Sequence, residues 1–470
     1  MQAAAGFRRV WPSLLIKGIG MTAITTNVQG YGTQWFSAPG DNLHVLSTGL
    51  LGSWDTLTAL ASHDNLRVDN SGQMWSMASV LEVRGSDVRT ANYEGGLMQS
   101  ESDSHLDAVI RYKGEAVGGQ IFNFGTINAY WAVGVEIGTT GTTFDNRGLI
   151  DAGSALRMGL DGADGQVVRN FGTMISAGNA SAAGDATYGN GVYVEGSNNL
   201  FYNWTGSTLT VTSGGAGVAF GGAGTGNSVK NAGTITSDTG WGVDLSGLAV
   251  GVSADVINTR GGVIAGGAGA VRGNSAENVI YNSGIMNGDV WLYGGDDYVS
   301  SGTYAQFNGD LYAGNGNDTL YGSGGDDSFY GQGQNDEIWG FDGDDFLFGG
   351  AGDDVIEGGD GADYLRGQGG SDTLNGGEGD DDIYGGVGAD IFVFEQNGNF
   401  DIIWDFQNNV DQIDLSDLGI TSYSALAAVM TTVGADVQID LSSLSGVYGD
   451  IIELRGSVTI GDLDAGDFIL

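Results

Sequence analysis

The most regular hydrophobic pattern in the chain is a nine-residue repeat that runs from residue 313 to residue 393. In every unit the eighth position is large and apolar, and the sixth position is Asp. Because side chains alternate between the two faces of a strand, the apolar residue is expected to point inward and its neighbours outward. Each unit therefore predicts a Gly-rich turn followed by a very short strand. The apolar positions are Leu320, Phe329, Ile338, Leu347, Ile356, Leu365, Leu374, Ile383 and Phe392.

Winding these units into a two-sided solenoid places equivalent residues above one another. With two units per coil, turns on the same side are 18 residues apart, so Asp318 stacks on Asp336 and Asp327 stacks on Asp345. Stacked carboxylates repel one another unless a cation lies between them, and a hard cation with oxygen ligands suits that place. The predicted carboxylate ligands are Asp318, Asp327, Asp336, Asp345, Asp354, Asp363, Asp372, Asp381 and Asp390, with weaker sites at Asp296 and Asp297.

Glycine fills the fourth position of every unit except the one that carries Gln334. The turn is expected to need glycine because its backbone adopts positive φ and approaches the ion closely. Freed glycine carbonyls are expected to supply the remaining oxygen ligands. The glycines predicted at the sites are Gly316, Gly325, Gly343, Gly352, Gly361, Gly370 and Gly379.

This repeat resembles the GGxGxDxUx nonapeptide of RTX (repeats-in-toxin) proteins. The resemblance implies a parallel β-roll that binds Ca²⁺ between turns 18 residues apart, with about seven ions in all. It also implies secretion by a Gram-negative bacterium, because the acidic and apolar residues 464–470 resemble the uncleaved signal of type I secretion machinery. Residues 394–420 resemble the segment that caps such rolls. After it, a short helix is expected at 424–430 and strands are expected at 437–441 and 451–454.

A second, looser repeat lies between residues 43 and 290, where Asn is followed closely by Gly and then by apolar residues. It predicts a parallel β-helix in which each Asn adopts the left-handed conformation and bonds to the Asn one coil away. A further strand is expected at motifs such as 191–194 and 217–220. The repeat resembles the passenger β-helices of large bacterial adhesins. Its Asn residues are Asn70, Asn92, Asn123, Asn146, Asn170, Asn203, Asn231, Asn258 and Asn282.

The predicted fold is therefore all-β, a parallel β-helix that continues into a calcium-binding β-roll with a C-terminal β cap. We expect an N-terminal arm or cap at 1–42, the β-helix at 43–290, the roll at 291–393, and the cap with the secretion signal at 394–470. The two solenoids are expected to share a core near residues 304–312. A cleaved signal peptide is not expected, because Lys17 interrupts the apolar run at 10–19.

The composition of the chain restricts the classes of partner that it is expected to bind. The chain has 470 residues and a formal net charge of −42, since 58 acidic residues face 16 basic ones. A protein this acidic is not expected to bind nucleic acid and should instead attract divalent cations. It has no Cys, so a metal rather than a disulfide is expected to fasten the fold. No stretch approaches 18 consecutive apolar residues, so no membrane span is predicted.

Candidate catalytic residues are few. The only histidines, which we expect to be surface or satisfied residues, and the only lysines are widely scattered: His44, His63, His105, Lys17, Lys113 and Lys230. Tyr130 with Arg111 or Arg147 is a candidate on one coil face, although such residues are more often plain outward-facing strand residues. Trp131, Trp204 and Trp241 are either a sugar-stacking stripe or, more often for such residues, packing beneath loops.

The sequence thus predicts a calcium-dependent structural protein rather than an enzyme. Surface-layer subunit, extracellular filament or matrix protein, and adhesin are the alternatives within this class. Self-association is expected because a solenoid ends in unpaired strand edges, and cell-surface polysaccharide is a candidate partner. The contrasting prediction is a polysaccharide lyase or uronan C5-epimerase, because the epimerases also carry RTX modules. Their Asp-Pro-His-Glu motif is impossible here, since Pro12 and Pro39 are the only prolines.

Overall fold

The computed structural model describes residues 22–24, 28–30, 34–36, 43–45, 50–53, 59–61, 64–102, 107–113, 117–177, 189–212, 214–395, 399–444, 451–456 and 458–470. The chain divides into two compact units, residues 1–241 and residues 242–470. Regular structure in the described residues is almost entirely β-strand, and no helix among them is long and apolar enough to cross a membrane. The predicted all-β solenoid is confirmed, whereas the four predicted domain boundaries stay predictions.

The first unit is a parallel β-helix whose described strands form three columns. The long strands β14 and β16 pair with neighbours in both the second and the third column. First column: β1 (Thr22–Ile24), β4 (Leu43–Val45), β7 (Arg67–Asn70), β10 (Arg89–Asn92), β13 (Gln120–Asn123), β15 (Thr143–Asn146), β17 (Val167–Asn170), β20 (Leu200–Asn203) and β23 (Asn227–Asn231). Second column: β2 (Val28–Gly30), β5 (Leu50–Ser53), β8 (Gln73–Ser76), β11 (Leu97–Ser100), β14 (Thr126–Ile137), β16 (Leu149–Met158), β18 (Thr173–Ser176), β21 (Thr208–Val211) and β24 (Thr234–Ser237). Third column: β3 (Gln34–Phe36), β6 (Ala59–Ala61), β9 (Leu81–Val83), β12 (Ala108–Tyr112), β19 (Val192–Val194) and β22 (Val218–Gly222); the 3-10 helix η1 (Leu160–Gly162) follows β16.

A ladder of buried asparagines follows the first column from β7 onward. Each amide donates to the side-chain oxygen of the Asn one coil on, at 2.8 to 2.9 Å, through Asn70, Asn92, Asn123, Asn146, Asn170, Asn203 and Asn231. In the second unit Asn258 donates to Asn282 in the same way, at 2.9 Å. The predicted ladder is confirmed, but the left-handed backbone is wrong for these residues. Each ladder Asn is the last residue of a strand, so its backbone is extended and pairs in register with its neighbour's.

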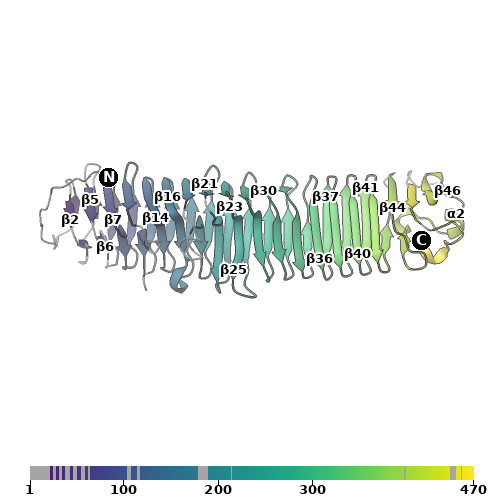
Figure 1. Cartoon of the computed structure of the whole chain (residues 1–470), viewed down its shortest axis with the longest axis horizontal. Helices are drawn as coiled ribbons and strands as arrows, with labels where there is room; N and C mark the ends of the chain where they lie inside the picture. Colours follow the sequence, from purple (N-terminus) through teal and green to yellow (C-terminus); the bar gives the residue numbers. More distant parts are fainter. Residues whose placement is uncertain are drawn as a thin grey trace. The chain divides into compact units, whose positions relative to one another are not determined.

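The second unit begins with three columns and continues with two. The middle column ends at β33, after which each coil has two strands. Strands β36, β37, β40 and β41 of this part are green in Figure 1. First column: β26 (Ala254–Asn258), β29 (Val279–Asn282), β32 (Tyr298–Ser301), β35 (Thr319–Tyr321), β37 (Glu337–Asp342), β39 (Val355–Asp360), β41 (Thr373–Glu378), β43 (Ile391–Val393), β45 (Gln412–Asp414) and β49 (Phe468–Ile469). Middle column: β27 (Val263–Gly266), β30 (Ile285–Asn287) and β33 (Gln306–Asn308). Last column: β28 (Gly269–Asn274), β31 (Val290–Tyr293), β34 (Leu311–Asn315), β36 (Ser328–Gly333), β38 (Phe346–Ala351), β40 (Tyr364–Gly369), β42 (Asp382–Val387), β44 (Phe400–Ile403) and β48 (Ile451–Leu454), while β25 (Trp241–Leu248) spans the division between the units.

The register of the two-stranded coils confirms the predicted 18-residue step. Leu320 pairs with Ile338, and Phe329 pairs with Leu347, so equivalent positions stack coil on coil. All nine apolar eighth positions are at most 1% exposed. The inward row of large side chains is therefore the core of the roll, and the alternation of each short strand turns the flanking residues outward.

The core expected at residues 304–312 is only partly there. Phe307 and Leu311 are buried, but Tyr304 is 75% exposed. Tyr312 lies on the outer face, where its ring stacks between Trp291 at 4.0 Å and Tyr330 at 4.8 Å. Tyr304 is exposed because it lies in the turn before β33, and Tyr312 points outward because it alternates with the inward Leu311 in β34.

After the last coil the chain folds back as a small antiparallel cap. β46 (Met430–Val433) and β47 (Asp436–Asp440) pair antiparallel, and β47 continues the sheet onto β48. The helix α2 (Tyr423–Ala427) starts at Ser422, whose side chain accepts a hydrogen bond from the backbone N–H of Ala425. The 3-10 helices are η2 (Ser416–Leu418), η3 (Leu441–Ser443) and η4 (Ala465–Asp467). The two predicted strands are confirmed, whereas the helix predicted at 424–430 ends at Ala427 and Met430 already begins β46.

Candidate metal centre

The sixth-position aspartates form two stacked columns inside the turns of the roll. Strand β36 supplies the end of one unit and the start of the next, and the turn that follows ends at Asp336. The Oδ1 atom of Asp336 accepts a hydrogen bond from the backbone N–H of Asp318 at 2.8 Å, and Asp354 does the same for Asp336. The second column repeats the arrangement from Asp327 to Asp381 at 2.7 to 2.8 Å. The structure thus brings together all nine predicted aspartates as the sequence period required.

One carboxylate oxygen of each stacked Asp is buried and has no hydrogen-bond partner. The orphaned atom is Oδ2 except in Asp327, whose Oδ2 accepts from the N–H of Ser323 and whose Oδ1 is left over. An unsatisfied buried polar atom costs about 1–3 kcal/mol, and more when the group is charged. Ten residues share this feature: Asp297, Asp318, Asp327, Asp336, Asp345, Asp354, Asp363, Asp372, Asp381 and Asp390.

Burial raises the pKa of these carboxyl groups above the ordinary value. Desolvation, opposed by the backbone hydrogen bond and reinforced by stacked neighbours, raises the pKa of Asp336 and of Asp363 to about 8. The pKa of Asp345 and of Asp372 rises to about 7 for the same reasons. Near neutral pH such a column must either hold protons or accept a cation.

First-position glycines form a cradle beneath seven of the ten orphaned oxygens. A Cβ atom on Gly340 would lie 1.9 Å from Oδ2 of Asp345, and one on Gly358 would lie 2.2 Å from Oδ2 of Asp363. The same relation, five residues apart, holds at Gly331, Gly349, Gly367, Gly376 and Gly385. Sequence reasoning missed these residues, although the signal was present, because every unit from residue 322 onward begins with Gly.

Fourth-position glycines bring the backbones of stacked turns into contact. Gly316, Gly343, Gly352, Gly361, Gly370 and Gly379 have positive φ between 130° and 151°, as predicted. A Cβ on Gly361 would lie 1.8 Å from the carbonyl oxygen of Gly343. Gly325 is the exception, because its φ is not positive and a Cβ there would meet nothing within 4 Å. Its predicted conformation is wrong, and the altered hydrogen bonding of Asp327 belongs to the same irregular turn.

These donors fit a hard divalent cation. Carboxylate oxygens without partners lie beside turns where carbonyl groups of successive coils stack closely, which is an all-oxygen environment of the kind that Ca²⁺ prefers. Nowhere in the described residues do three or more His, Cys, Asp or Glu side chains gather around one point, so backbone carbonyls would have to complete any coordination. The assignment of individual ligands stays a prediction.

Both columns extend beyond the nine predicted aspartates. Downstream, Asp401 accepts from the N–H of Asp381 and Asp411 accepts from the N–H of Asp390, each at 3.1 Å. Both carboxylate oxygens of Asp411 are used, because the second accepts from Gln407 at 2.7 Å. Upstream, Asp297 accepts from the N–H of Asn278 at 2.6 Å. Sequence reasoning named only Asp297 of these, since steps of 19 to 21 residues leave the period.

Those of the remaining candidates that the structure describes contact other residues rather than one another. Nδ1 of His44 lies 3.0 Å from Asp69, and Arg111 pairs with Glu136 at 2.7 Å, while His63 and His105 lie outside the described residues. The side chain of Tyr130 also lies outside them. Trp204 stacks on Phe171 and Tyr202 at 5.0 and 4.4 Å, which indicates packing. The prediction that the chain is not an enzyme stays a prediction.

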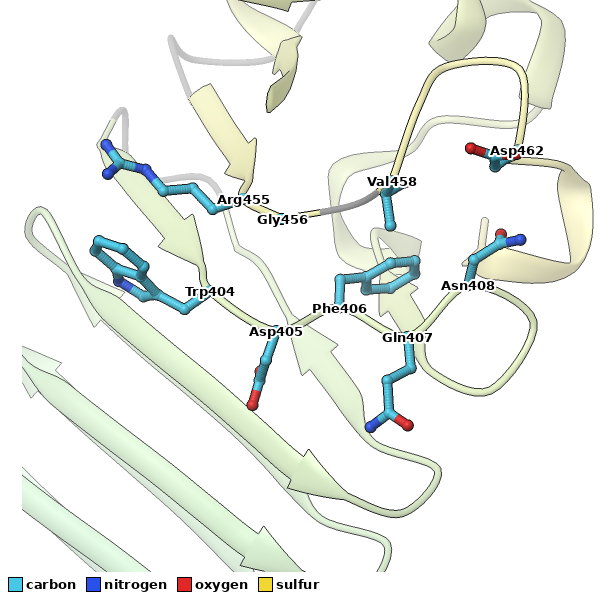
Figure 2. A pocket seen from close by; sticks show the side chains of 9 residues that line it. All are labelled: Trp404, Asp405, Phe406, Gln407, Asn408, Arg455, Gly456, Val458 and Asp462. Atoms are coloured by element: carbon cyan, nitrogen blue, oxygen red, sulfur yellow. The ribbon is translucent and has the colours of Figure 1, made fainter. Parts of the chain in front are cut away.

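A pocket of about 420 Å³ lies where the last coil meets the cap. Figure 2 shows Arg455 beside Trp404, and the guanidinium lies 4.5 Å from the ring centroid. Asp405, whose pKa is raised by burial, accepts from the N–H groups of Gly385 and Gly386 at 2.9 and 3.0 Å. These contacts close the last coil, and the described lining contains neither His nor Lys that would serve as a base.

Comparisons with known proteins agree with the geometry of the turns. The family model of the RTX calcium-binding nonapeptide repeat matches four overlapping segments, residues 306–338, 321–356, 339–374 and 357–392. A solution structure of a subunit of the Azotobacter vinelandii mannuronan C5-epimerase matches at 24% identity over 32% of this chain and 80% of its own, with a TM-score of 0.21. We draw nothing from a likeness at that TM-score. No curated protein matches the chain. Residues 306–392 are therefore RTX calcium-binding nonapeptide repeats, and this chain is a calcium-binding β-roll protein.

Proposed function

We propose that this chain is a secreted structural protein of the bacterial cell surface whose roll folds only when it binds extracellular calcium. The observation that supports this most is the set of ten buried carboxylate oxygens without a partner. A fold that leaves so many oxygens unsatisfied is unfavourable without a counter-ion, because each one adds a desolvation cost. The same oxygens become ligands once a divalent cation is present.

In this proposal, the chain's own residues provide a calcium switch. In the cytosol, where calcium is scarce, mutual repulsion of the stacked aspartates keeps the repeat segment unfolded and suitable for export by type I machinery. Outside, about seven ions would be held between successive turns by Oδ2 atoms such as those of Asp336 and Asp354, together with carbonyl oxygens. Sites with Kd of about 10⁻⁴ to 10⁻³ M fill at millimolar calcium. Each filled site then adds RT ln(1 + [L]/Kd) to the stability.

Self-association completes the proposed structural role as a surface-layer, filament, matrix or adhesin protein. Large apolar side chains remain exposed on the outer faces of the roll, among them Phe341, Phe346 and Val355. Exposed apolar surface of this kind often marks an interface between proteins. Acidic turn residues such as Asp326 and Asp344 would allow calcium to bridge copies or to link them to acidic cell-surface polysaccharide.

Electron microscopy and light scattering of the full chain test the proposed role. Ordered filaments or sheets are expected at millimolar Ca²⁺ and should be absent in excess chelator. Mg²⁺ at the same concentration is the matched control, and it should not replace Ca²⁺ because it demands a smaller, near-octahedral site. Particles that stay monomeric at every calcium concentration would contradict the structural role. A roll that is already folded in chelator would contradict the switch.

A further inference from the structure

We propose that the roll has an additional calcium site upstream of the nonapeptide repeats. Asn278 and Asp297 form this site, together with the backbone of the stacked turns that precede Asp297 and Asp318. The inference rests on the proposed calcium binding of the roll, and it extends that binding into coils that still have three strands. Asn278 lies between β28 and β29 and carries no charge, so the periodic pattern of aspartates does not reveal it.

The hydrogen bonds of the aspartate column continue without a break to Asn278. The N–H of Asp297 donates to Oδ1 of Asp318 at 2.7 Å, and the N–H of Asn278 donates to Oδ1 of Asp297 at 2.6 Å. These are the bonds that link Asp318 to Asp336 further down. The step lengthens from 18 to 21 residues at Asp297 because the coil also contains β33.

The turn before Asp297 has the geometry of a nonapeptide turn. Gly295 occupies the fourth position with φ of 103°, and Tyr293 in the second position has φ of 75°, like Phe341 at 79°. A Cβ on Gly316 would lie 1.9 Å from the carbonyl oxygen of Gly295, so the two turns stack as closely as those downstream. Asp296 accepts from the N–H of Asn317 at 2.9 Å, which repeats the fifth-position contact of the other turns.

Two buried oxygens at this place have no partner. Asn278 is 0% exposed and Asp297 is 1% exposed, yet Oδ1 of Asn278 and Oδ2 of Asp297 accept no hydrogen bond. Nδ2 of Asn278 donates to Oδ1 of Asp297 at 2.8 Å. In each side chain, the orphaned oxygen is bonded to the same carbon atom as the atom that makes this hydrogen bond. Gly273 precedes Asn278 by five residues, the spacing of the glycine cradles, but a Cβ there would first meet the backbone of Leu292 at 2.8 Å and then Nδ2 of Asn278 at 3.1 Å rather than an orphaned oxygen.

This arrangement provides one amide oxygen, carboxylate oxygens and stacked carbonyls, all of them hard donors suited to Ca²⁺. Replacing one carboxylate by an amide lowers the negative charge of the site, so we expect it to bind more weakly than the repeat sites and to fill last. A bound ion would join the loop before β29 to the loop before β32. Calcium would thereby stabilise coils that lie outside the repeats themselves.

The test counts the calcium ions bound to the full chain after equilibrium dialysis and follows amide exchange in residues 273–297. Asn278→Ala should lose one ion per chain and should lose the slowing of exchange that the highest calcium concentrations produce. Asn278→Asp removes the amide donors but keeps the oxygen, so it should retain the ion and bind it several-fold more tightly. A structural role for the amide donors alone would instead make both variants equally defective.

Failure of the additional site can be distinguished from failure of the repeat sites. If Asn278→Ala binds as many ions as the wild type, or if Asn278→Asp loses the ion as well, the additional site is wrong while the repeat sites stand. Asp354→Asn, within the repeats, serves as the control. A calcium count that does not change in that variant would overturn the proposed function of the roll itself.

Discussion

The molecule has two ladders of stacked side chains, formed by asparagines in the first unit and by aspartates in the second. The two ladders differ in how their buried polar atoms find hydrogen-bond partners. An Asn side chain both donates and accepts, so Asn146, Asn170 and Asn203 satisfy one another from coil to coil. An ionised Asp only accepts, so the backbone N–H of the stacked residue uses one oxygen and the other is left over. A neutral ladder is therefore complete in itself, and a charged ladder requires a cation.

Chelation should produce the largest difference between the two ladders. We expect excess chelator to abolish amide protection in residues 313–393 and to leave residues 64–177 and 189–231 protected. With about seven sites at roughly ten times Kd, calcium contributes on the order of 10 kcal/mol. Hydrogen exchange measured by mass spectrometry with and without Ca²⁺ reads both regions in one sample. Equal loss of protection in both regions would mean that the two ladders do not differ in their need for calcium.

The pH dependence in chelator should also separate the two regions. The pKa of Asp336 and of Asp363 rises from 3.8 to about 8 on folding, because burial disfavours the charged form. A group with a raised pKa favours the folded state below its unfolded value, and this contribution is lost as the pH rises toward the folded value. The calcium-free roll, unfolded at pH 8, should therefore regain strand structure as the pH falls to 5, and circular dichroism in chelator would show it. Equal spectra at both pH values would argue against protonated columns.

Replacing one ladder asparagine by aspartate tests whether the neutral ladder depends on its amide donors. Asn170→Asp places a carboxylate where Nδ2 now donates to Oδ1 of Asn203 and to the carbonyl oxygen of Thr208. Three acceptors would then face one another in a buried site, at a cost of about 3 kcal/mol or more. Denaturant unfolding should give this loss equally with and without calcium. Recovery of stability on adding calcium would mean that the coil itself can form a metal site.

The reciprocal exchange in the roll should have a smaller effect that depends on calcium. Asp354→Asn keeps the acceptor for the N–H of Asp336 but removes the charged oxygen. Loss of ligation should destabilise the calcium-loaded roll by about 1–2 kcal/mol. In chelator the sign should reverse, because one repulsive buried charge is gone. Thermal melts with calcium, and the residual strand signal in circular dichroism in chelator, provide the comparison. A variant with less structure than the wild type under both conditions would contradict the expected reversal.

The smallest effects should come from the glycine cradle. Gly340→Ala places a methyl group 1.9 Å from Oδ2 of Asp345, so the carboxylate must move, and about one ion should be lost from the calcium count. Gly325→Ala is the matched control, because φ there is not positive and the added methyl group meets nothing within 4 Å. The control should change stability by less than about 1 kcal/mol. If the two variants bound the same number of ions and were equally stable, the first-position glycines would have no role in calcium binding.

Much of the roll could be predicted because its period is local. Two units of nine residues fix the 18-residue stacking, and strand alternation fixes the inward position of residues such as Ile338. The cradle glycines were not predicted, since their role depends on how close Asp345 comes to Gly340 in space. Asn278, Asp401 and Asp411 escaped prediction because β30 and the cap lengthen the coils there and shift these residues from the nine-residue register. The extended backbone of the ladder asparagines depends on strand pairing rather than on the preference of Asn for turns.

A crystal structure of the calcium-loaded chain, with anomalous scattering used to locate the ions, would show whether calcium lies between the stacked aspartates. We expect anomalous peaks between successive turns, within coordination distance of Oδ2 in residues such as Asp336, Asp354 and Asp372. Turns that contain only water, with the same coils intact and those oxygens hydrogen-bonded to solvent, would contradict it.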